Sequence, residues 1–407
     1  MIGKLLLTIF PLSLLISTGV SESITIFISI IFFINFFIEK KLTNDKYLIL
    51  LLIVWLGLIL NLIFSENFTS SFSRNFFFFR YIIFIYFLIS VFKNDKNLNS
   101  ILLIWLLTLF IVCFDIYFEF FSGRNVLGIK SIYNDRISSF LGKELKIGHF
   151  VLGFVFICLG YYFEKFYNYS KKHKIFGFLL LIFFIIALCF TGERSNTIKG
   201  LIGIFIFISL GNKMIFKYKK ILLVFFIISP IIIYVSSSKI QGRFNDIILP
   251  VMNKGIIYAI KETQHGAHFY TAIEIFKTYP LFGVGNKNFR EECLKEKYFN
   301  KDYKQSNVRC SNHPHQIYFE LLSEHGIVGT ITLISIMFYI LSQSLSIYKK
   351  NQNLIHLGSI IFVLITFLPI LPSGSFFTSW GASIFWLNFS IMLFYNNKLT
   401  VGESFKN

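Results

Sequence analysis

The chain has 407 residues, of which 55% are hydrophobic and 15% are charged, and it carries a formal net charge of +18. This composition excludes a string of soluble domains, because about a quarter of the residues in such domains are charged. It also argues against nucleic-acid binding. Most lysines outside one long polar segment lie in short breaks between apolar stretches, so no basic soluble module is available to bind nucleic acid.

Twelve apolar stretches follow one another along the chain. Their length and composition are typical of helices that cross a lipid bilayer. The stretches lie at about residues 5–18, 24–38, 47–64, 76–92, 101–121, 148–163, 175–191, 197–210, 221–235, 326–346, 355–371 and 382–395. The sequence therefore predicts an all-α polytopic membrane protein with about 12 transmembrane helices.

Lysine-rich breaks follow every second apolar stretch. Positively charged loops stay in the cytoplasm, so this alternation predicts that both chain termini are cytoplasmic. The polar segment 236–316, between the ninth and tenth stretches, then faces the other side of the membrane. We expect N-terminal transmembrane helices at 1–179, a core with the polar segment at 180–345, and C-terminal transmembrane helices with a short cytoplasmic tail at 346–407.

Five of the eight histidines lie in the polar segment or just after it. They are His265, His268, His313, His315 and His325. A neutral imidazole can take a proton from a hydroxyl group, because its pKa lies near neutral pH. Pro314 separates two of these histidines and can begin a helix. The plainer interpretation, surface histidines at a helix start, is therefore also open.

The five cysteines fall into two groups. Cys113, Cys158 and Cys189 lie in apolar stretches, where cysteine packs as a small hydrophobic residue. Cys293 and Cys310 lie in the polar segment and are candidates for a disulfide if that segment is outside the cytoplasm. Spacing alone does not establish the bond, because disulfide geometry is specific.

One motif contains a histidine and two glycines and resembles a family signature. His315-Gln316, nine further residues and Gly326-x-x-Gly329 follow the pattern His-[Asn/Ser/Gln]-x9-Gly-x-x-Gly. This pattern resembles the signature of the O-antigen ligase and O-antigen polymerase superfamily. The resemblance implies a structural role for the two glycines.

Two further elements are similar to that superfamily. Pro280-x-x-Gly283-x-Gly285, followed by Phe289, resembles the Pro-x-x-Gly-x-Gly-x-x-x-Phe element of its large periplasmic loop. The proline and glycines are expected to be structural. Arg194, in a short turn before an apolar stretch, resembles the first essential arginine of the family.

The resemblance is strongest from about residue 180 to residue 345. It implies a fold similar to the membrane-embedded glycosyltransferases called GT-C. Family members pass a glycan from undecaprenyl diphosphate to a sugar hydroxyl, which belongs to lipid A–core in ligases and to another lipid-linked glycan in polymerases. The resemblance implies an inverting enzyme at the periplasmic face of the bacterial inner membrane. It also implies that no metal or other cofactor is needed, in keeping with the absence of an Asp-x-Asp motif from the loops.

The resemblance also implies roles for individual residues. His315, with His313 as the alternate, would deprotonate the acceptor hydroxyl. Arg194 and Arg136 would hold the donor diphosphate, because a guanidinium can bind phosphate oxygens through two donors. Lipopolysaccharide or another surface polysaccharide would be the product. Transfer to a protein hydroxyl is a third possibility beside ligase and polymerase.

The chain departs from the family pattern at one position. A second arginine usually stands a few residues before an aromatic residue in the large loop. Phe269 stands at the aromatic position, and His265 stands where the arginine would be. We expect its phosphate-binding role to fall to one or more of His265, His268, Arg243, Arg290 and Arg309.

Three charged residues in apolar stretches lie outside these motifs. Arg80 either belongs to a functional site or reaches toward the membrane surface. Asp115 and Glu119 share one helical face. We expect them to form a structural ion pair with Arg80 or with Arg136.

Two interpretations come from other classes of protein. The first is a membrane metallohydrolase with a zinc site built from His265, His268, His313 and His315. No His-Glu-x-x-His motif supports it. The second is a transporter, although few charged residues lie within the apolar stretches.

Overall fold

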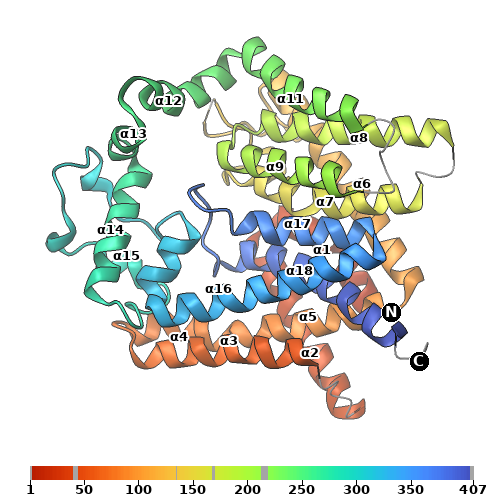
Figure 1. Ribbon diagram of the computed structural model, residues 1–407, viewed down its shortest axis with the longest axis horizontal. Coiled ribbons are helices and arrows are strands. Elements are labelled where there is room, and N and C mark those ends of the chain that lie inside the picture. The colour runs from red at the N-terminus through yellow and green to blue at the C-terminus, as the bar shows by residue number, and fades with distance from the viewer. Residues whose placement is uncertain (1, 40–44, 134, 167–169, 212–218, 404–407) are drawn as a thin grey trace.

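The computed structural model describes residues 2–39, 45–133, 135–166, 170–211 and 219–403. Within these ranges every regular element is a helix, and most of the long helices run along one common direction (Figure 1). Among the described residues, six helices are long and apolar enough to cross a membrane. The predicted all-α polytopic membrane class is therefore confirmed, while the number of twelve spans stays a prediction.

The helices coincide with the predicted apolar stretches. The six long apolar helices are α3 (Lys46–Ile63), the continuous run Phe68–Phe92, α6 (Asp95–Ser122), α7 (Ile147–Lys165), α8 (Lys171–Phe190) and α16 (Ile317–Asn351). The continuous run consists of α4 (Phe68–Asn75), η1 (Phe76–Phe78) and α5 (Phe79–Phe92). The remaining stretches form α1 (Ile2–Ile16), α2 (Thr18–Glu39), α9 (Arg194–Leu210), α11 (Lys219–Ser236), α17 (Leu354–Thr366) and α18 (Ser379–Glu403).

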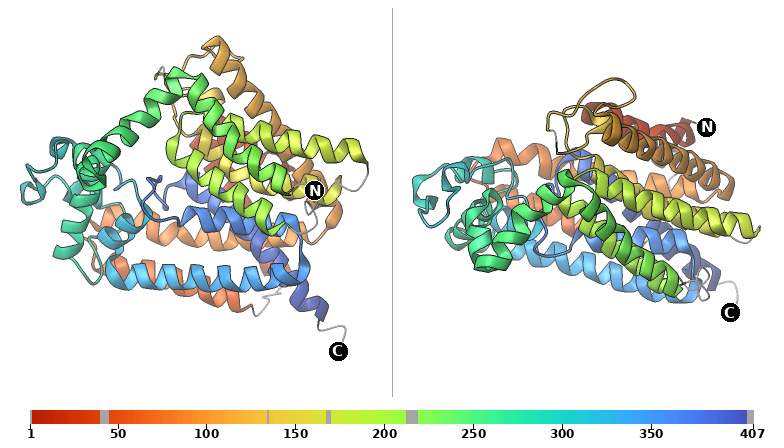
Figure 2. Two further views of the ribbon diagram at one scale, coloured as in Figure 1. Left: turned by 45° about the horizontal axis from the view of Figure 1, so that its top comes forward. Right: turned by 90° about the horizontal axis from the view of Figure 1, so that it is seen from above.

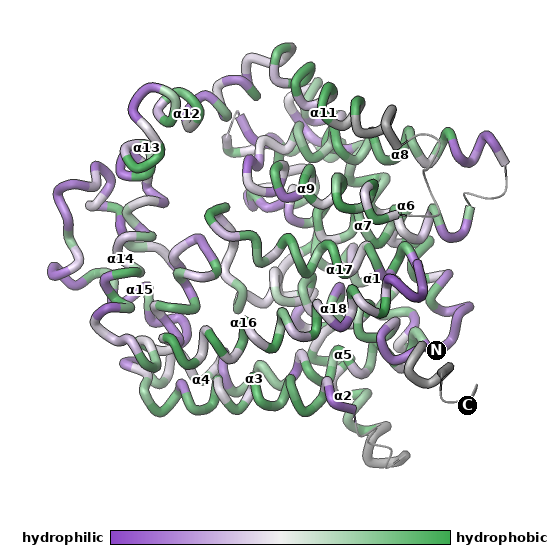
Figure 3. The backbone as a smooth tube through the Cα atoms, in the orientation of Figure 1, coloured by the Kyte–Doolittle hydropathy of each residue, from purple (hydrophilic) through white to green (hydrophobic). Residues whose placement is uncertain are grey.

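The polar segment gathers at one end of the helix bundle, and the start of α1 and the end of α18 lie at the opposite end (Figures 1 and 2). Hydrophobic residues follow the helices between these two ends (Figure 3). The segment contains α12 (Ser238–Lys254), α13 (Ile256–Glu262), α14 (Gln264–Thr278), α15 (Phe289–Glu292), η3 (Glu296–Tyr298) and η4 (Ser306–Val308). This layout suits a membrane protein with one large extramembrane segment.

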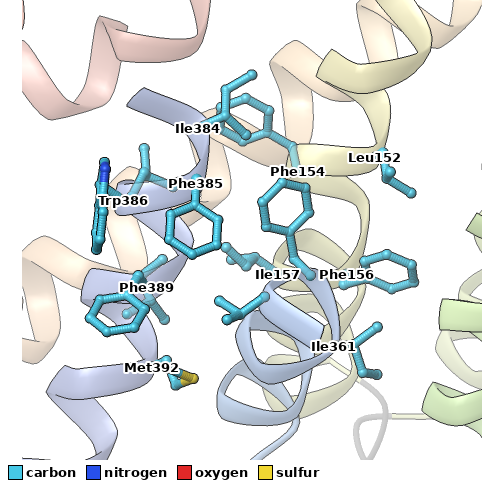
Figure 4. Packing of buried hydrophobic residues seen from close by; sticks show 14 of the residues in the cluster. Leu152, Phe154, Phe156, Ile157, Ile361, Ile384, Phe385, Trp386, Phe389 and Met392 are labelled. Carbon is cyan, nitrogen blue, oxygen red and sulfur yellow. The ribbon is translucent and has the colours of Figure 1, made fainter. Parts of the chain in front are cut away.

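The middle of the bundle is an aromatic and aliphatic core, built in part by α7, α17 and α18 (Figure 4). Phe156 of α7 and Trp386 of α18 are both buried there. A Cβ atom on Gly160 would lie 2.3 Å from the carbonyl oxygen of Leu354, and one on Gly358 would lie 2.3 Å from that of Phe156. Glycines therefore let α7 and α17 approach closely, as small residues do between membrane helices. This rigid core supports the helix ends that carry the polar segment.

Candidate active site

Four of the predicted histidines gather at the polar end of the bundle. His265 and His268 lie near the start of α14, whereas His313 and His315 lie in the loop before α16. The ring centre of His315 lies 5.2 Å from that of His265 and 5.1 Å from that of His268. Its distance from the His313 ring is 4.2 Å. We call these four residues the histidine group.

His315 is held in an unusual backbone conformation. Its φ is 60°, in the left-handed region that costs a non-glycine residue about 1–3 kcal/mol. The amide of Ser373 donates to the His315 carbonyl at 2.7 Å, and the Oγ atom of Ser311 lies 2.9 Å from Nε2 of the ring. The following residue, Gln316, caps α16 with its side chain. Strain of this kind persists where the surroundings fix it, and it clusters at functional sites.

Burial keeps the histidine group neutral near pH 7. It lowers the pKa of His315 to about 3, and it lowers the pKa of His313 and of His265 to about 4. Burial also lowers the pKa of His268, although the carbonyl of Val308, which accepts from its Nε2 at 3.1 Å, opposes the shift. A neutral imidazole keeps one free lone pair. The group can therefore accept a proton.

Three predicted arginines form a second group, the arginine group, which consists of Arg136, Arg194 and Arg243. Arg194 begins α9, and its guanidinium donates to the carbonyl of Arg243 on α12 at 2.7 Å. Arg243 pairs with Asp135 at 3.1 Å. Arg136 donates to the carbonyl of Leu145 at 2.8 Å. The start of α9, α12 and the loop before α7 thus bring together guanidinium groups that are distant in the sequence.

The arginine group and the histidine group act on each other electrostatically. Burial lowers the pKa of Arg194, and repulsion from the other two arginines lowers it further. The charge of Arg194 in turn contributes to the lowered pKa of His265, after burial and the neighbouring His268. Fixed positive charge therefore lies within electrostatic range of neutral bases.

Glu193 interacts electrostatically with the arginine group, and the sequence analysis missed it. It is buried, and its carboxylate accepts from the amide of Gly148 at 2.8 Å and from the side chain of Asn196 at 2.5 Å. Burial raises the pKa of Glu193, while the charge of Arg136 opposes the shift. Its position beside Arg194 in a short polar turn is the signal that would have found it.

The two glycine motifs, residues 280–285 and residues 326–329, pack against each other, and we call this contact the glycine junction. The helix α16 is kinked at Gly326, where φ is 61° and ψ is −167°. The amide of Ile327, just after the kink, donates to the carbonyl of Pro280 at 2.8 Å. A Cβ atom on Gly326 would lie 2.4 Å from the Leu281 backbone, and one on Gly283 would lie 2.4 Å from the backbone of α16. Only glycines allow this close approach of two backbones.

Gly285 and Gly329, the other predicted structural glycines, lie at the edges of the same junction. A Cβ atom on Gly285 would lie 2.2 Å from the hydroxyl of Ser65, just after α3. A Cβ atom on Gly329 would lie 2.7 Å from Cβ of His325. His325 itself is buried against Phe377, with ring centres 4.9 Å apart, and lies outside the histidine group.

Three asparagines that the sequence analysis did not single out fix the junction to α3 and α4. The side chain of Asn61 donates to the carbonyl of Phe282 at 2.8 Å and accepts from the amide of Asn286 at 3.1 Å. The side chain of Asn286 donates to that of Asn75 at 2.8 Å. All three are buried, so a satisfied polar network specifies how the 280–286 segment sits on the bundle.

A cavity of about 210 Å³, which we call the basic cavity, lies beside the histidine group. His313 forms part of its wall. The charged residues in the wall are Arg74, Lys287, Arg290, Glu320 and Glu324. An open hollow of about 440 Å³ shares Arg290 and Asn312 with this basic cavity. Of the five charged residues, the sequence analysis considered only Arg290. The others come from α4, from α16 and from a loop, so no local pattern groups them.

Asp115 and Glu119 do not form the expected ion pair with Arg80 or Arg136. Asp115 accepts from a loop amide at 2.7 Å, and Glu119 accepts from the amide of Ser139 at 2.6 Å. Neither carboxylate is in an ion pair with another described residue. The expectation was wrong because amides of the α6–α7 loop, which contains η2 (Ser139–Leu141), satisfy these carboxylates instead.

Two other arginines have structural contacts away from the histidine group. Arg80 of α5 pairs with Glu22 of α2 at 2.9 Å. Arg309 donates to the carbonyl of Cys293 at 3.0 Å and to that of Leu294 at 3.1 Å. Arg309 therefore stabilises its own loop through hydrogen bonds. Among the residues considered as replacements for the family's second arginine, it is the least suited to bind phosphate.

The structure joins Cys293 and Cys310 by a disulfide with Cα atoms 5.4 Å apart. Cys113, Cys158 and Cys189 are buried and unpaired. Over the described ranges, no group of three or more His, Cys, Asp or Glu side chains is arranged to hold a metal ion. The histidine group therefore lacks the arrangement that the zinc interpretation requires.

One comparison with known proteins bears directly on this site. Residues 177–334 match the protein-family model for O-antigen ligase. The matched region includes the histidine group, Arg194 and Arg243, and the glycine junction. No curated protein matches the chain. The chain therefore carries an O-antigen ligase domain at residues 177–334, which confirms its predicted place in the O-antigen ligase and polymerase superfamily.

Proposed function

We propose that the protein transfers a glycan from undecaprenyl diphosphate to a sugar hydroxyl at the periplasmic face of the bacterial inner membrane, as a ligase. One observation carries the proposal: His315 lies among neutral histidines beside the arginine group, inside an O-antigen ligase domain. Displacement of a diphosphate by a hydroxyl needs a proton acceptor and fixed positive charge. This arrangement supplies both.

The arginine group binds the donor diphosphate in this proposal. Arg194 begins α9, where the helix dipole adds to the positive potential. Its bond to the Arg243 carbonyl uses one donor, and a guanidinium has five. His265 and His268 take the place of the missing second arginine and offer neutral hydrogen bonds to the phosphate oxygens. The lipid tail stays in the bilayer.

His315 acts as the general base, with His313 as the alternate. The acceptor oxygen forms a bond to the anomeric carbon as the bond to the diphosphate oxygen breaks. The diphosphate leaves with the electron pair, the proton goes to the imidazole, and the configuration inverts. A bound diphosphate raises the pKa of the nearby imidazole toward the working pH. Base catalysis then contributes about 10²–10⁴-fold, and orientation of the hydroxyl adds to it.

A polymerase of the same superfamily is the main alternative. It would use the same donor site and base, with a second lipid-linked glycan as the acceptor. A protein hydroxyl would be a third kind of acceptor. No observation on the described residues favours a metallohydrolase or a transporter, since the histidines lack a metal-binding arrangement and charged residues in the long helices are few.

The same proposal includes twelve spans, with both termini in the cytoplasm. The lysine-rich breaks support it, as does the separation of the polar segment from the end of α18 (Figure 1). We keep the division into 1–179, 180–345 and 346–407. A cysteine introduced at Lys301 should react with a membrane-impermeant thiol reagent in spheroplasts. One introduced at Lys398 should not react. The opposite pattern would reverse the topology.

The proposed function is tested by complementation of ligase-null and polymerase-null bacterial strains, with glycan ladders read on gels. Rescue by the wild type should be lost with His315→Ala and with Arg194→Ala in normally expressed protein. The rescued strain identifies the acceptor class. His173→Ala, on α8 and outside the site, is the matched control. Rescue that survives both His315→Ala and Arg194→Ala would refute the proposed site.

A further inference from the structure

We propose that the basic cavity binds an acidic group of the acceptor, namely a phosphate or carboxylate carried by a sugar. The inference rests on the proposed function and adds the chemistry of the acceptor. His313 forms part of the cavity wall, and its ring centre lies 4.2 Å from that of His315. A sugar held in the cavity therefore presents its hydroxyls to the base, while the donor diphosphate lies on the arginine group.

The cavity wall contains cations that form no ion pair within the described part of the chain. Lys287 and Arg290 form no ion pair with another described residue. Nε of Arg290 is buried without a hydrogen-bond partner. Arg74 donates only to neutral groups, the carbonyl of Phe377 at 3.0 Å and the hydroxyl of Ser379 at 2.9 Å. Cations that are partly removed from water need an anionic partner, and a ligand would provide it.

The two carboxylates in the wall are engaged elsewhere. Glu320 accepts from the hydroxyl of Ser375 and from the amide of Phe376, the latter at 2.9 Å. Glu324 accepts from the amide of Phe289 at 3.1 Å. Each carboxylate thus ties a cavity loop to α16. They shape the wall and leave the three cations for a ligand.

Lys287 shows backbone strain that a purely structural residue would not need. Its φ is 71°, which costs a non-glycine residue about 1–3 kcal/mol. A glycine would adopt this conformation without that cost. Its neighbour Asn286 is held by Asn75 and Asn61, so the network forces the conformation on Lys287. A lysine in a conformation that glycine would adopt without strain fits a role for its ammonium group in binding. Burial lowers its pKa, and repulsion by Arg74 and Arg290 adds to the shift.

The size of the cavity restricts the ligand. Its volume of about 210 Å³ is below the about 300–1,000 Å³ of pockets for drug-sized ligands, so it suits one sugar unit. Asn312 and Thr378 in the wall can bond to sugar hydroxyls. The adjoining open hollow, which shares Asn312 and Arg290 with the cavity, leaves room for the rest of a longer glycan.

The test measures binding rather than transfer. Purified full-length protein in lipid nanodiscs is titrated calorimetrically with glucose 1-phosphate, with glucuronate and with uncharged methyl glucoside. We expect at least one charged sugar to bind about 10-fold or more tightly than methyl glucoside, because charge-assisted hydrogen bonds are the stronger ones. Lys287→Gly and Arg290→Gln should each reduce that affinity about 10-fold. Lys287→Gly also removes the strained backbone, so this variant should fold.

Two controls separate the cavity from other positive charge. Lys277→Gln removes an exposed lysine that pairs with Glu274 on α14 and should leave the affinity unchanged. Arg194→Gln should leave the affinity for glucuronate unchanged as well. Equal binding of methyl glucoside, or no binding of any of the three sugars, overturns the proposal. It is also overturned if Arg194→Gln abolishes charged-sugar binding while Lys287→Gly preserves it.

A parallel titration with inorganic pyrophosphate tests the donor site independently. Its affinity should fall with Arg194→Gln and persist with Lys287→Gly. Failure of this arm would count against the proposed donor site and leave the result for the cavity intact. Glucose 1-phosphate binding without glucuronate binding would assign a phosphate to the acceptor, and the reverse result would assign a carboxylate.

Discussion

The arginine group and the basic cavity are two positive regions beside the same histidines, yet their cations are held differently. In the arginine group, Arg194 donates to a backbone carbonyl and Arg243 is paired with Asp135. In the cavity, Lys287 and Arg290 have no ion-pair partner among the described residues. In the first region the guanidinium groups are held in place and their charge is partly neutralised, which suits binding of a leaving diphosphate in the proposed function. In the second region the cations lack ion-pair partners, which suits binding of the acidic sugar that we propose.

The largest effect is expected where the two regions meet. His315→Ala should lower the transfer rate about 10²–10⁴-fold, because it removes the proposed base between donor and acceptor. The measurement is the initial rate of glycan transfer by membranes that contain equal amounts of protein. His313→Ala should cost less. If His313→Ala instead causes the greater loss, the two histidines exchange roles.

Arginine substitutions should distinguish the two regions. Arg194→Ala should lower the rate about 10²–10³-fold at every acceptor concentration, because it removes charge that stabilises the leaving diphosphate. Arg290→Ala should raise the KM for the acceptor and leave kcat nearly unchanged, since it removes binding energy that is equal in ground and transition states. Initial rates over a range of acceptor concentrations provide the measurement. Identical kinetic effects of the two substitutions would mean that the regions form one site.

Substitution of a glycine in the glycine junction should destabilise the folded protein. Gly326→Ala should lower the free energy of unfolding by about 3–5 kcal/mol, because φ is positive there and the Leu281 backbone leaves no room for a Cβ. Gly57→Ala is the matched control, since no atom lies within 4 Å of its Cβ position inside α3. It should stabilise by up to about 1 kcal/mol. Thermal unfolding in detergent measures both, and equal stability of the two variants would contradict the described kink.

Loss of the disulfide should weaken binding in the basic cavity more than binding at the arginine group. Cys293→Ser opens a bridge with a sequence separation of 17 and should cost about 3 kcal/mol. Charged-sugar binding should weaken, because Cys310 lines the adjoining hollow, while pyrophosphate binding should persist. Unfolding curves with and without a reductant give the stability change. A wild type that reductant does not affect would contradict this expectation.

A further effect concerns pH. The pKa of His265 and of His313 is about 4 in the folded protein and about 6.5 in the unfolded chain. Between these values the unfolded chain binds more protons, so stability is full above pH 6.5 and falls as pH drops toward about 4. Thermal midpoints from pH 7 to pH 5 should therefore decrease, and His265→Gln should flatten the decrease. A flat wild-type profile would mean that these imidazoles are exposed.

The sequence by itself determined the features that depend on short stretches of chain. Helices of bilayer length follow from runs of apolar residues, and α3, α6, α7 and α8 lie where such runs occur. The motif from His315 to Gly329 was recognised by its resemblance to a family signature, and the structure shows the cap, the kink and the close backbone contact that its residues provide. Arg194 was recognised in the same way, by its resemblance to a family arginine in a short turn, and it begins α9 in the structure.

Only the tertiary structure decided how charges meet. Asp115 and Glu119 could have faced an arginine by spacing alone, yet loop amides satisfy them. Arg74, Lys287 and Glu320 share a cavity although they come from three distant elements. Helical periodicity specifies which residues share a face of one helix. It does not specify which faces of different elements meet, because that depends on packing of the core and on the asparagine network at the glycine junction.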